Sequence, residues 1–110
     1  MSGAQAVQRQ QEPSAGLLLL EKWFAARCDG NWEQHYGVRI DSLDNPGWTL
    51  EIDLDGTPAQ SRCLARTMIQ RGENDWINFW VADKRFHARM GVGNLDEAIG
   101  IFVGWFDKSI

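Results

Sequence analysis

The chain has 110 residues and a net charge of −4, with 44% hydrophobic and 24% charged residues. A chain of this length folds as one domain around a single core, and its composition is that of a globular protein. The acidity argues against nucleic-acid binding, because phosphate contacts need clustered Lys and Arg. The run Leu17–Leu20 is followed at once by Glu21 and Lys22, so the sequence predicts no signal peptide or membrane span, and we expect a cytoplasmic protein that binds no membrane.

The chain begins with a polar segment, which is followed by a predicted helix. Residues 1–13 are rich in Gln, Ala and Ser, which predicts a disordered tail before a single domain at residues 14–110. Ser14 is placed to cap a helix that continues to about Cys28. Gly30 follows this helix and can take the left-handed conformation that ends it. The predicted apolar stripe of the helix comprises Leu17, Leu20, Phe24 and Cys28, with Trp23 beside it.

Two strands joined by a turn come next. Residues 36–43 are predicted to form the first strand, with Val38 and Ile40 facing inward. Residues 45–48, Asn-Pro-Gly-Trp, are typical of a type II turn, in which proline fixes φ at the second position and glycine takes a positive φ at the third. Residues 48–55 alternate between apolar and polar, which predicts a half-buried strand with an acidic outer face. Its inward residues are Trp48, Leu50, Ile52 and Leu54, and its acidic outward residues are Glu51, Asp53 and Asp55.

The second half of the chain reads mainly as strands. Residues 62–71 fit either a helix or a strand, and a strand is favoured because a turn at residues 72–75 leads into a clear strand at residues 76–82. That strand is apolar on both faces, so either both faces are covered or one presents exposed aromatic side chains. A fifth strand is predicted at residues 86–90. The two faces of the fourth strand carry Ile77, Phe79 and Val81 on one side and Trp76, Asn78 and Trp80 on the other.

A final helix follows Asn94, which can cap it, with Glu97 three residues on as in a capping box. Gly100 and Gly104 fall on its exposed face and cost about 1 kcal/mol each relative to alanine, so packing must stabilise this helix. Its apolar face comprises Leu95, Ala98, Ile99, Phe102, Trp105 and Phe106.

These elements together predict an α+β fold, an antiparallel meander of four or five strands with the N-terminal and C-terminal helices packed on one face. The residues expected to face the helices are Val38, Ile40, Leu50, Ile52, Leu54, Ile77, Phe79 and Val81. The opposite face is expected to present Arg39, Asp41, Thr49, Glu51, Asp53, Trp76, Asn78 and Trp80.

Several motifs in the chain resemble those of a known family. Residues 28–33 read C-D-G-N-W-E, residues 43–54 read L-D-N-P-G-W-T-L-E-I-D-L, and residues 94–105 contain N-L-D-E-A-I and F-x-x-W. This pattern resembles the immunity protein 53 family of bacterial polymorphic toxin systems, over roughly residues 17–107. The motif positions are Cys28, Asp29, Gly30, Trp32, Glu33, Asp44, Asn45, Pro46, Gly47 and Trp48. The resemblance implies a small α+β protein that binds and neutralises a cognate toxin and has no chemistry of its own.

The face opposite the helices is the candidate toxin-binding surface, because tryptophans inside a charged rim are typical of binding hot spots. Its candidate residues are Asp41, Glu51, Asp53, Trp76, Asn78 and Trp80. In the alternative interpretation, the tryptophans are structural and pack under residues 62–71 or under the tail. An acidic protein suits a basic partner, for example a nuclease toxin. The chain alone is expected to be a monomer or a weak homodimer, and a third hypothesis is a homo-oligomer that buries the aromatic face.

A catalytic alternative would use Asp29, Glu33 and His35 to bind or hydrolyse a small molecule. These side chains can instead bond to the backbone at the end of the first helix, and the sequence supplies no nucleophile or further ligands at a fixed spacing. We therefore expect no enzyme, no catalytic residue, no metal and no cofactor. Cys28 and Cys63 lack a C-x-x-C spacing and are expected to be free thiols, one of them buried at a helix end.

Overall fold

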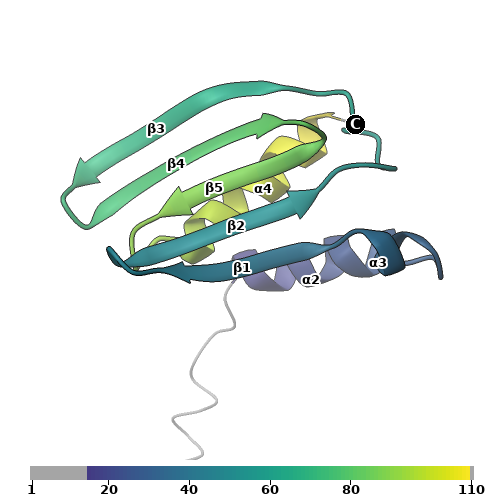
Figure 1. Cartoon of the computed structure of the whole chain (residues 1–110), viewed down its shortest axis with the longest axis horizontal. Coiled ribbons are helices and arrows are strands. Elements are labelled where there is room, and N and C mark those ends of the chain that lie inside the picture. The colour runs from purple at the N-terminus through teal and green to yellow at the C-terminus, as the bar shows by residue number, and fades with distance from the viewer. Residues whose placement is uncertain (1–14, 110) are drawn as a thin grey trace, which may run out of the picture.

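The computed structural model describes residues 15–109, which form helices at both ends of the chain and a sheet between them (Figure 1). In chain order the elements are α2 (Ala15–Arg27), α3 (Trp32–His35), β1 (Val38–Leu43), β2 (Gly47–Asp53), β3 (Leu64–Gly72), β4 (Asp75–Ala82), β5 (Arg85–Met90) and α4 (Leu95–Ser109). The predicted tail at residues 1–13 and the predicted cap Ser14 lie outside the described residues.

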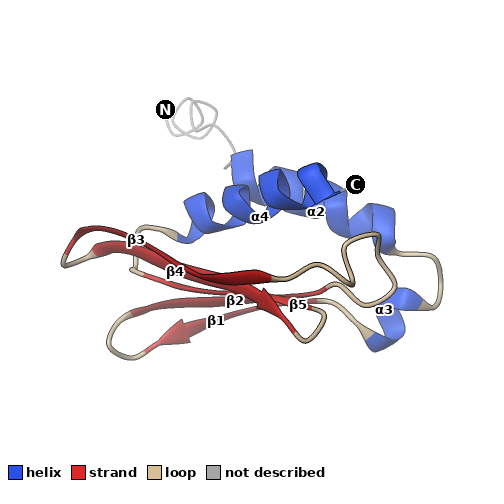
Figure 2. Ribbon diagram, turned by 90° about the horizontal axis from the view of Figure 1, so that it is seen from above, coloured by secondary structure: helices blue, strands red, loops and turns tan. Residues whose placement is uncertain are grey.

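The strands form one antiparallel sheet of five in the order β1-β2-β5-β4-β3. The predicted α+β fold, with the N-terminal and C-terminal helices on one face of the sheet, is confirmed (Figure 2). The predicted simple meander is wrong, because β5 pairs with β2 in the centre and β3 becomes an edge. Phe86, Ala88 and Met90 of β5 are each at most 2% exposed, and the apolar face that they form gains most from a central position under the helices.

The core lies between α4 and the sheet, where the sequence placed it. Ile99 and Phe102 of α4 are buried and belong to one cluster with the inward side chains of the strands. α2 packs beside α4, and its Trp23 meets Phe102 and Phe106 edge-on, at ring-centroid distances of 5.1 and 5.4 Å. Such aromatic pairs add about 0.5–1.5 kcal/mol beyond the area they bury. α2 therefore holds its place mainly through α4.

The buried stripe of α2 differs from the predicted one. Gly16, Leu20 and Trp23 are buried, whereas Leu17 and Phe24 remain 45% and 36% exposed. A run of four leucines gives this helix apolar side chains on every side, so periodicity could not identify which side is buried.

Two predicted local motifs take a different form. Gly47 does not have the positive φ of a type II turn but pairs with Leu43 as the first residue of β2. A Cβ atom at Gly47 would collide with the carbonyl oxygen of Met90, so the close approach of β5 requires glycine there. Asn94 does not cap α4 with its side-chain oxygen, which has no hydrogen-bond partner among the described residues. Its Nδ2 atom donates instead to Asp75 Oδ1 at 2.9 Å.

The ambiguous segment at residues 62–71 is a strand, as favoured, and forms β3. It pairs with β4 through the predicted turn, with two irregularities of register. β4 and β5 are joined by Asp83 and Lys84, whose φ values of 56° and 60° are those of the mirror-image turns that suit hairpins. The short helix α3 was not predicted from the sequence.

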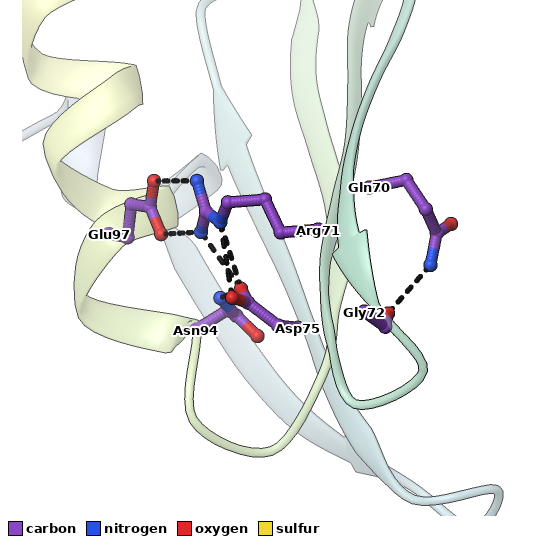
Figure 3. A network of polar contacts seen from close by, with 6 residues as sticks. All are labelled: Gln70, Arg71, Gly72, Asp75, Asn94 and Glu97. Atoms are coloured by element: carbon purple, nitrogen blue, oxygen red, sulfur yellow. Dashed lines mark hydrogen bonds and ion pairs between the residues drawn. The ribbon is translucent and has the colours of Figure 1, made fainter.

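Arg71, near the end of β3, ties the β3–β4 hairpin to the start of α4 (Figure 3). Its Nη1 atom donates to Glu97 Oε2 at 3.1 Å, and its Nη2 atom donates to Asp75 Oδ1 at 2.9 Å. The hydrogen bond from Arg71 is the largest cause that holds the pKa of Glu97 and the pKa of Asp75 below their ordinary values. The Glu97 carboxylate therefore accepts hydrogen bonds from Arg71, which is distant in the sequence, and does not form the predicted capping box with Asn94.

Candidate functional site on the open face of the sheet

One face of the sheet carries no described helix (Figure 2), and we call it the open face. The cross-strand registers place side chains from all five strands on it. Its members are Arg39, Asp41, Thr49, Glu51, Asp53, Arg66, Met68, Gln70, Trp76, Asn78, Trp80, Arg85, His87 and Arg89. All six predicted binding residues therefore lie on one surface.

Trp80 is the centre of an aromatic and cationic cluster on the open face. Its ring stacks on His87 with a centroid distance of 5.0 Å and an interplanar angle of 9°. The guanidinium carbon of Arg66 lies 3.9 Å from the ring centroid, and that of Arg89 lies 5.8 Å away. Trp80 remains half-buried with these neighbours in place. The structural alternative is thus partly true, since Arg66 of β3 does pack on this tryptophan, but Trp80 remains partly exposed.

A network of charges fills the β1–β2–β5 side of the open face. Glu51 lies 3.5 Å from Arg39, 4.0 Å from Arg85 and 3.7 Å from His87. Asp53 accepts a hydrogen bond from Arg85 Nε at 2.8 Å and another from the Gly37 amide at 2.9 Å. Buried and paired in this way, Asp53 joins β1, β2 and β5 and offers little surface to a partner, whereas Asp41 is exposed.

The open face is mixed in charge rather than acidic. Arg66, Arg85, His87 and Arg89 were missing from the predicted surface. The last three alternate in the segment R-F-H-A-R-M, between apolar residues that face the helices. Applying the period of two to that strand would have found them. Arg66 carried no such signal, because its place depends on the irregular register of β3.

The proposed catalytic cluster is a turn held by its own side chains. Asp29 Oδ1 accepts from the amides of Asn31 and Trp32, both at 2.9 Å, and these bonds, with Trp32 first, lower the pKa of Asp29. Glu33 accepts from the amides of Asp29 and Gly30, both at 2.9 Å. His35 Nδ1 lies 3.1 Å from the Asn31 carbonyl oxygen. Both carboxylates already accept hydrogen bonds from backbone amides. This geometry therefore does not support the hydrolytic alternative.

Of the other motif residues, the two tryptophans connect distant parts of the fold. Trp32 is buried and donates from Nε1 to the Asp55 carbonyl at 2.7 Å, which ties the turn after α2 to the end of β2. Trp48 donates from Nε1 to the Val92 carbonyl at 3.0 Å. Asp44, Asn45 and Pro46 form the exposed turn between β1 and β2.

The two cysteines are free, as predicted, but both are exposed. The expectation of a buried thiol at a helix end is therefore wrong. Cys28 does follow α2, and its Sγ atom lies 3.3 Å from the Phe24 carbonyl oxygen, but the residue is exposed. Gly30, two residues on, has the predicted left-handed conformation, with a φ of 91°.

These features define a small α+β protein with a sheet covered by helices on one side and a polar, aromatic surface on the other. The chain belongs to the immunity protein 53 family, whose family model matches residues 17–107. No curated protein and no solved structure shows significant similarity to the chain. No helix among the described residues is long and apolar enough to cross a membrane.

Proposed function

We propose that this protein neutralises a cognate toxin domain by docking the open face of its sheet over the toxin's active site or substrate groove. Membership of an immunity protein family makes a toxin the expected partner. The observation that carries the choice of surface is Trp80, a half-buried indole held between Arg66 and His87 on a central part of the sheet.

Trp80 has the properties of a binding anchor. Stacking on His87 and contact with Arg66 fix the ring before any partner arrives, so little side-chain freedom is lost on binding. Trp76 lies on the same face of the same strand, which adds a second large aromatic surface. Interfaces built on such anchors bury about 800 Å² per partner, and a few aromatic and arginine residues supply most of the affinity.

The charges of the open face would orient the toxin. Asp41 and Glu51 on β1 and β2 offer carboxylates to basic toxin residues, as in a nuclease. Arg66 and Arg89 are exposed on β3 and β5 and require acidic or polar toxin residues opposite them. A complementary toxin surface therefore carries both signs of charge, and this pairing mainly raises the association rate and fixes the register of docking.

Co-expression with the toxin domain encoded beside this protein tests the function. We expect the cells to survive and the two proteins to co-purify, whereas loss of both protection and complex would overturn the proposal.

Substitutions test the surface separately. Trp80→Ala should weaken the purified complex by about 2 kcal/mol or more, measured by calorimetry. Leu18→Ala is the matched control, because Leu18 is an exposed apolar residue of α2, on the helix side of the sheet, and should leave the affinity unchanged. Protection that persists with unchanged Trp80→Ala affinity would overturn the open face as the docking surface while leaving the toxin as the partner.

A further inference from the structure

The two edges of the sheet differ in how they are protected against pairing with another strand. β3, at one edge, has two register irregularities and carries Arg66 and Arg71, which are devices that discourage edge-to-edge association. β1, at the other edge, pairs with β2 residue by residue from Val38 to Leu43 without a bulge. Within the described part of the chain β1 has no second neighbour. β1 is thus a regular edge with an open row of backbone groups.

The backbone groups that β1 turns outward can be identified. The Asp53 amide donates to the Gly37 carbonyl at 3.0 Å, so the odd-numbered residues of β1 direct their amide and carbonyl groups toward β2. Because these directions alternate along a strand, Val38, Ile40 and Ser42 direct theirs away from the sheet. A second strand could bond to these three residues.

The charges of Arg39 and Asp41 favour one register when β1 pairs with the β1 strand of a second copy. In an antiparallel pair related by a two-fold axis, the outward-directed residues can align in three registers, centred on residue 39, 40 or 41. Centring on residue 39 sets Arg39 against itself, and centring on residue 41 sets Asp41 against itself. Centring on Ile40 instead sets Arg39 opposite Asp41 of the other copy, twice over. Opposite charges directly across a pair stabilise it and like charges destabilise it, so the sequence V-R-I-D-S is complementary to itself in one register.

An apolar groove runs beside this edge on the helix side. One hollow of about 390 Å³ is lined by Leu17, Ile40, Trp48 and Val92, among others, and a second of about 340 Å³ by Leu17, Phe24, Tyr36 and Val38, among others. Leu17 borders both, so the hollows follow α2 along β1. Five of the large hydrophobic residues that the described chain leaves exposed line this groove, namely Leu17 45%, Phe24 36%, Tyr36 37%, Ile40 38% and Val92 55%. A contiguous exposed apolar surface of this kind marks an interaction site.

We propose that the protein forms a two-fold homodimer through β1, in which two five-stranded sheets join into one and the groove residues of the two copies cover each other. Three independent features meet at this edge: outward backbone groups, self-complementary charges and exposed apolar residues. Residues opposite each other in an antiparallel pair point to the same face. The two open faces therefore lie on one side of the joined sheet. Dimerisation leaves the Trp80 cluster on that side free, whereas Asp41 of each copy lies opposite Arg39 of the other. This inference does not rest on the proposed function.

Sedimentation equilibrium and light scattering test the dimer and its register. The wild-type chain should reach twice its 12.5 kDa mass as concentration rises. Arg39→Asp and Asp41→Arg should each raise the dissociation constant about tenfold or more, because each places like charges opposite one another. The double variant Arg39→Asp/Asp41→Arg should restore the dimer. Arg66→Asp is the matched control on the other edge and should leave the dimer unchanged.

An engineered disulfide checks the geometry directly. In a background with Cys28→Ser and Cys63→Ser, Ile40→Cys should cross-link the dimer on oxidation, because Cα atoms of a hydrogen-bonded antiparallel pair lie about 5.5 Å apart. Ser42→Cys, placed opposite Val38 of the other copy, should not. A chain that stays at 12.5 kDa at every concentration overturns the proposal. So does a dimer that Arg39→Asp does not weaken, or a monomer whose toxin affinity Arg39→Asp lowers, since the edge then belongs to the toxin.

Discussion

On the helix side of the sheet Leu50, Ile52 and Phe86 are fully buried, while on the open face of the same strands Glu51 and His87 meet at 3.7 Å beside the half-buried Trp80. The two sides come from a single alternating pattern, yet they differ in what they bury. The helix side excludes water from apolar side chains, which is the main source of folding free energy. The open face pairs charges in partial contact with solvent, where each pair adds little to stability. The comparison teaches that one face of the sheet stabilises the fold, while the other, which we propose for toxin binding, adds little to stability.

Phe102→Ala should show the largest effect, because it removes a ring that touches Trp23, Phe86 and Phe106 at the centre of the covered side. We expect the free energy of unfolding, measured in urea, to fall by about 3–5 kcal/mol. Phe102→Leu keeps most of the volume and should lose less than half as much. A small loss for the alanine variant would show that the core lies elsewhere.

Trp80→Ala sharpens the comparison from the other face. Its stacking and cation contacts are partly exposed to solvent, so the free energy of unfolding should fall by only about 1 kcal/mol. The same urea titration measures this value, and Trp80→Phe should lose less. A loss as large as that of Phe102→Ala would mean that the open face is a second core, and the division between the faces would fail.

Gly104→Ala should stabilise the protein by about 1 kcal/mol, because alanine favours the helix and nothing lies within 4 Å of the added Cβ. Gly16→Ala is the matched control in α2, where the Cβ would collide with Asp96, and it should destabilise. Thermal unfolding followed by circular dichroism gives both signs. If Gly104→Ala destabilised the protein, the outer side of α4 would have to contact another part of the chain.

Glu97→Gln should have the smallest effect, and one that depends on pH. The hydrogen bond from Arg71 lowers the pKa of Glu97 in the folded state, so this carboxylate stabilises the protein above the ordinary glutamate pKa. That contribution is lost as the pH falls through the lowered value. Urea midpoints of the wild type and the variant should therefore differ most near about pH 7 and converge as the pH falls below the lowered pKa of Glu97. If the difference in urea midpoint stayed constant across this pH range, the Arg71–Glu97 ion pair could not be its cause.

The helices and strands of the fold could be predicted from the sequence, but which strands pair with one another could not. Alternation in β2 and β4 identified their inward faces, and the α4 pattern identified its buried side, because each repeat matches the period of its element. No periodic pattern in the sequence indicates that β2 pairs with β5. Both strands are apolar on one side, and nothing local decides which of several apolar strands lies beside another.

The candidate site was predicted in outline for the same reason. Trp76 and Trp80 follow from the alternation in β4, but the contact between Trp80 and Arg66 depends on a bulged strand whose register the sequence does not encode locally. Asp53 looked like an outward carboxylate, and it is buried because Arg85 of β5 and the Gly37 amide, just before β1, both donate hydrogen bonds to it.

The central pair of the sheet sets an order of events during synthesis. β2 ends at residue 53, and its inner neighbour β5 begins only at residue 85. As the nascent chain leaves the ribosome, the β1–β2 hairpin acquires that neighbour only after residues 54–84 have also been made, and a lone hairpin is only marginally stable in water. The sheet closes only once β5 has been made, so a chain that lacks residues 85–109 would be left without both its central strand and helix α4.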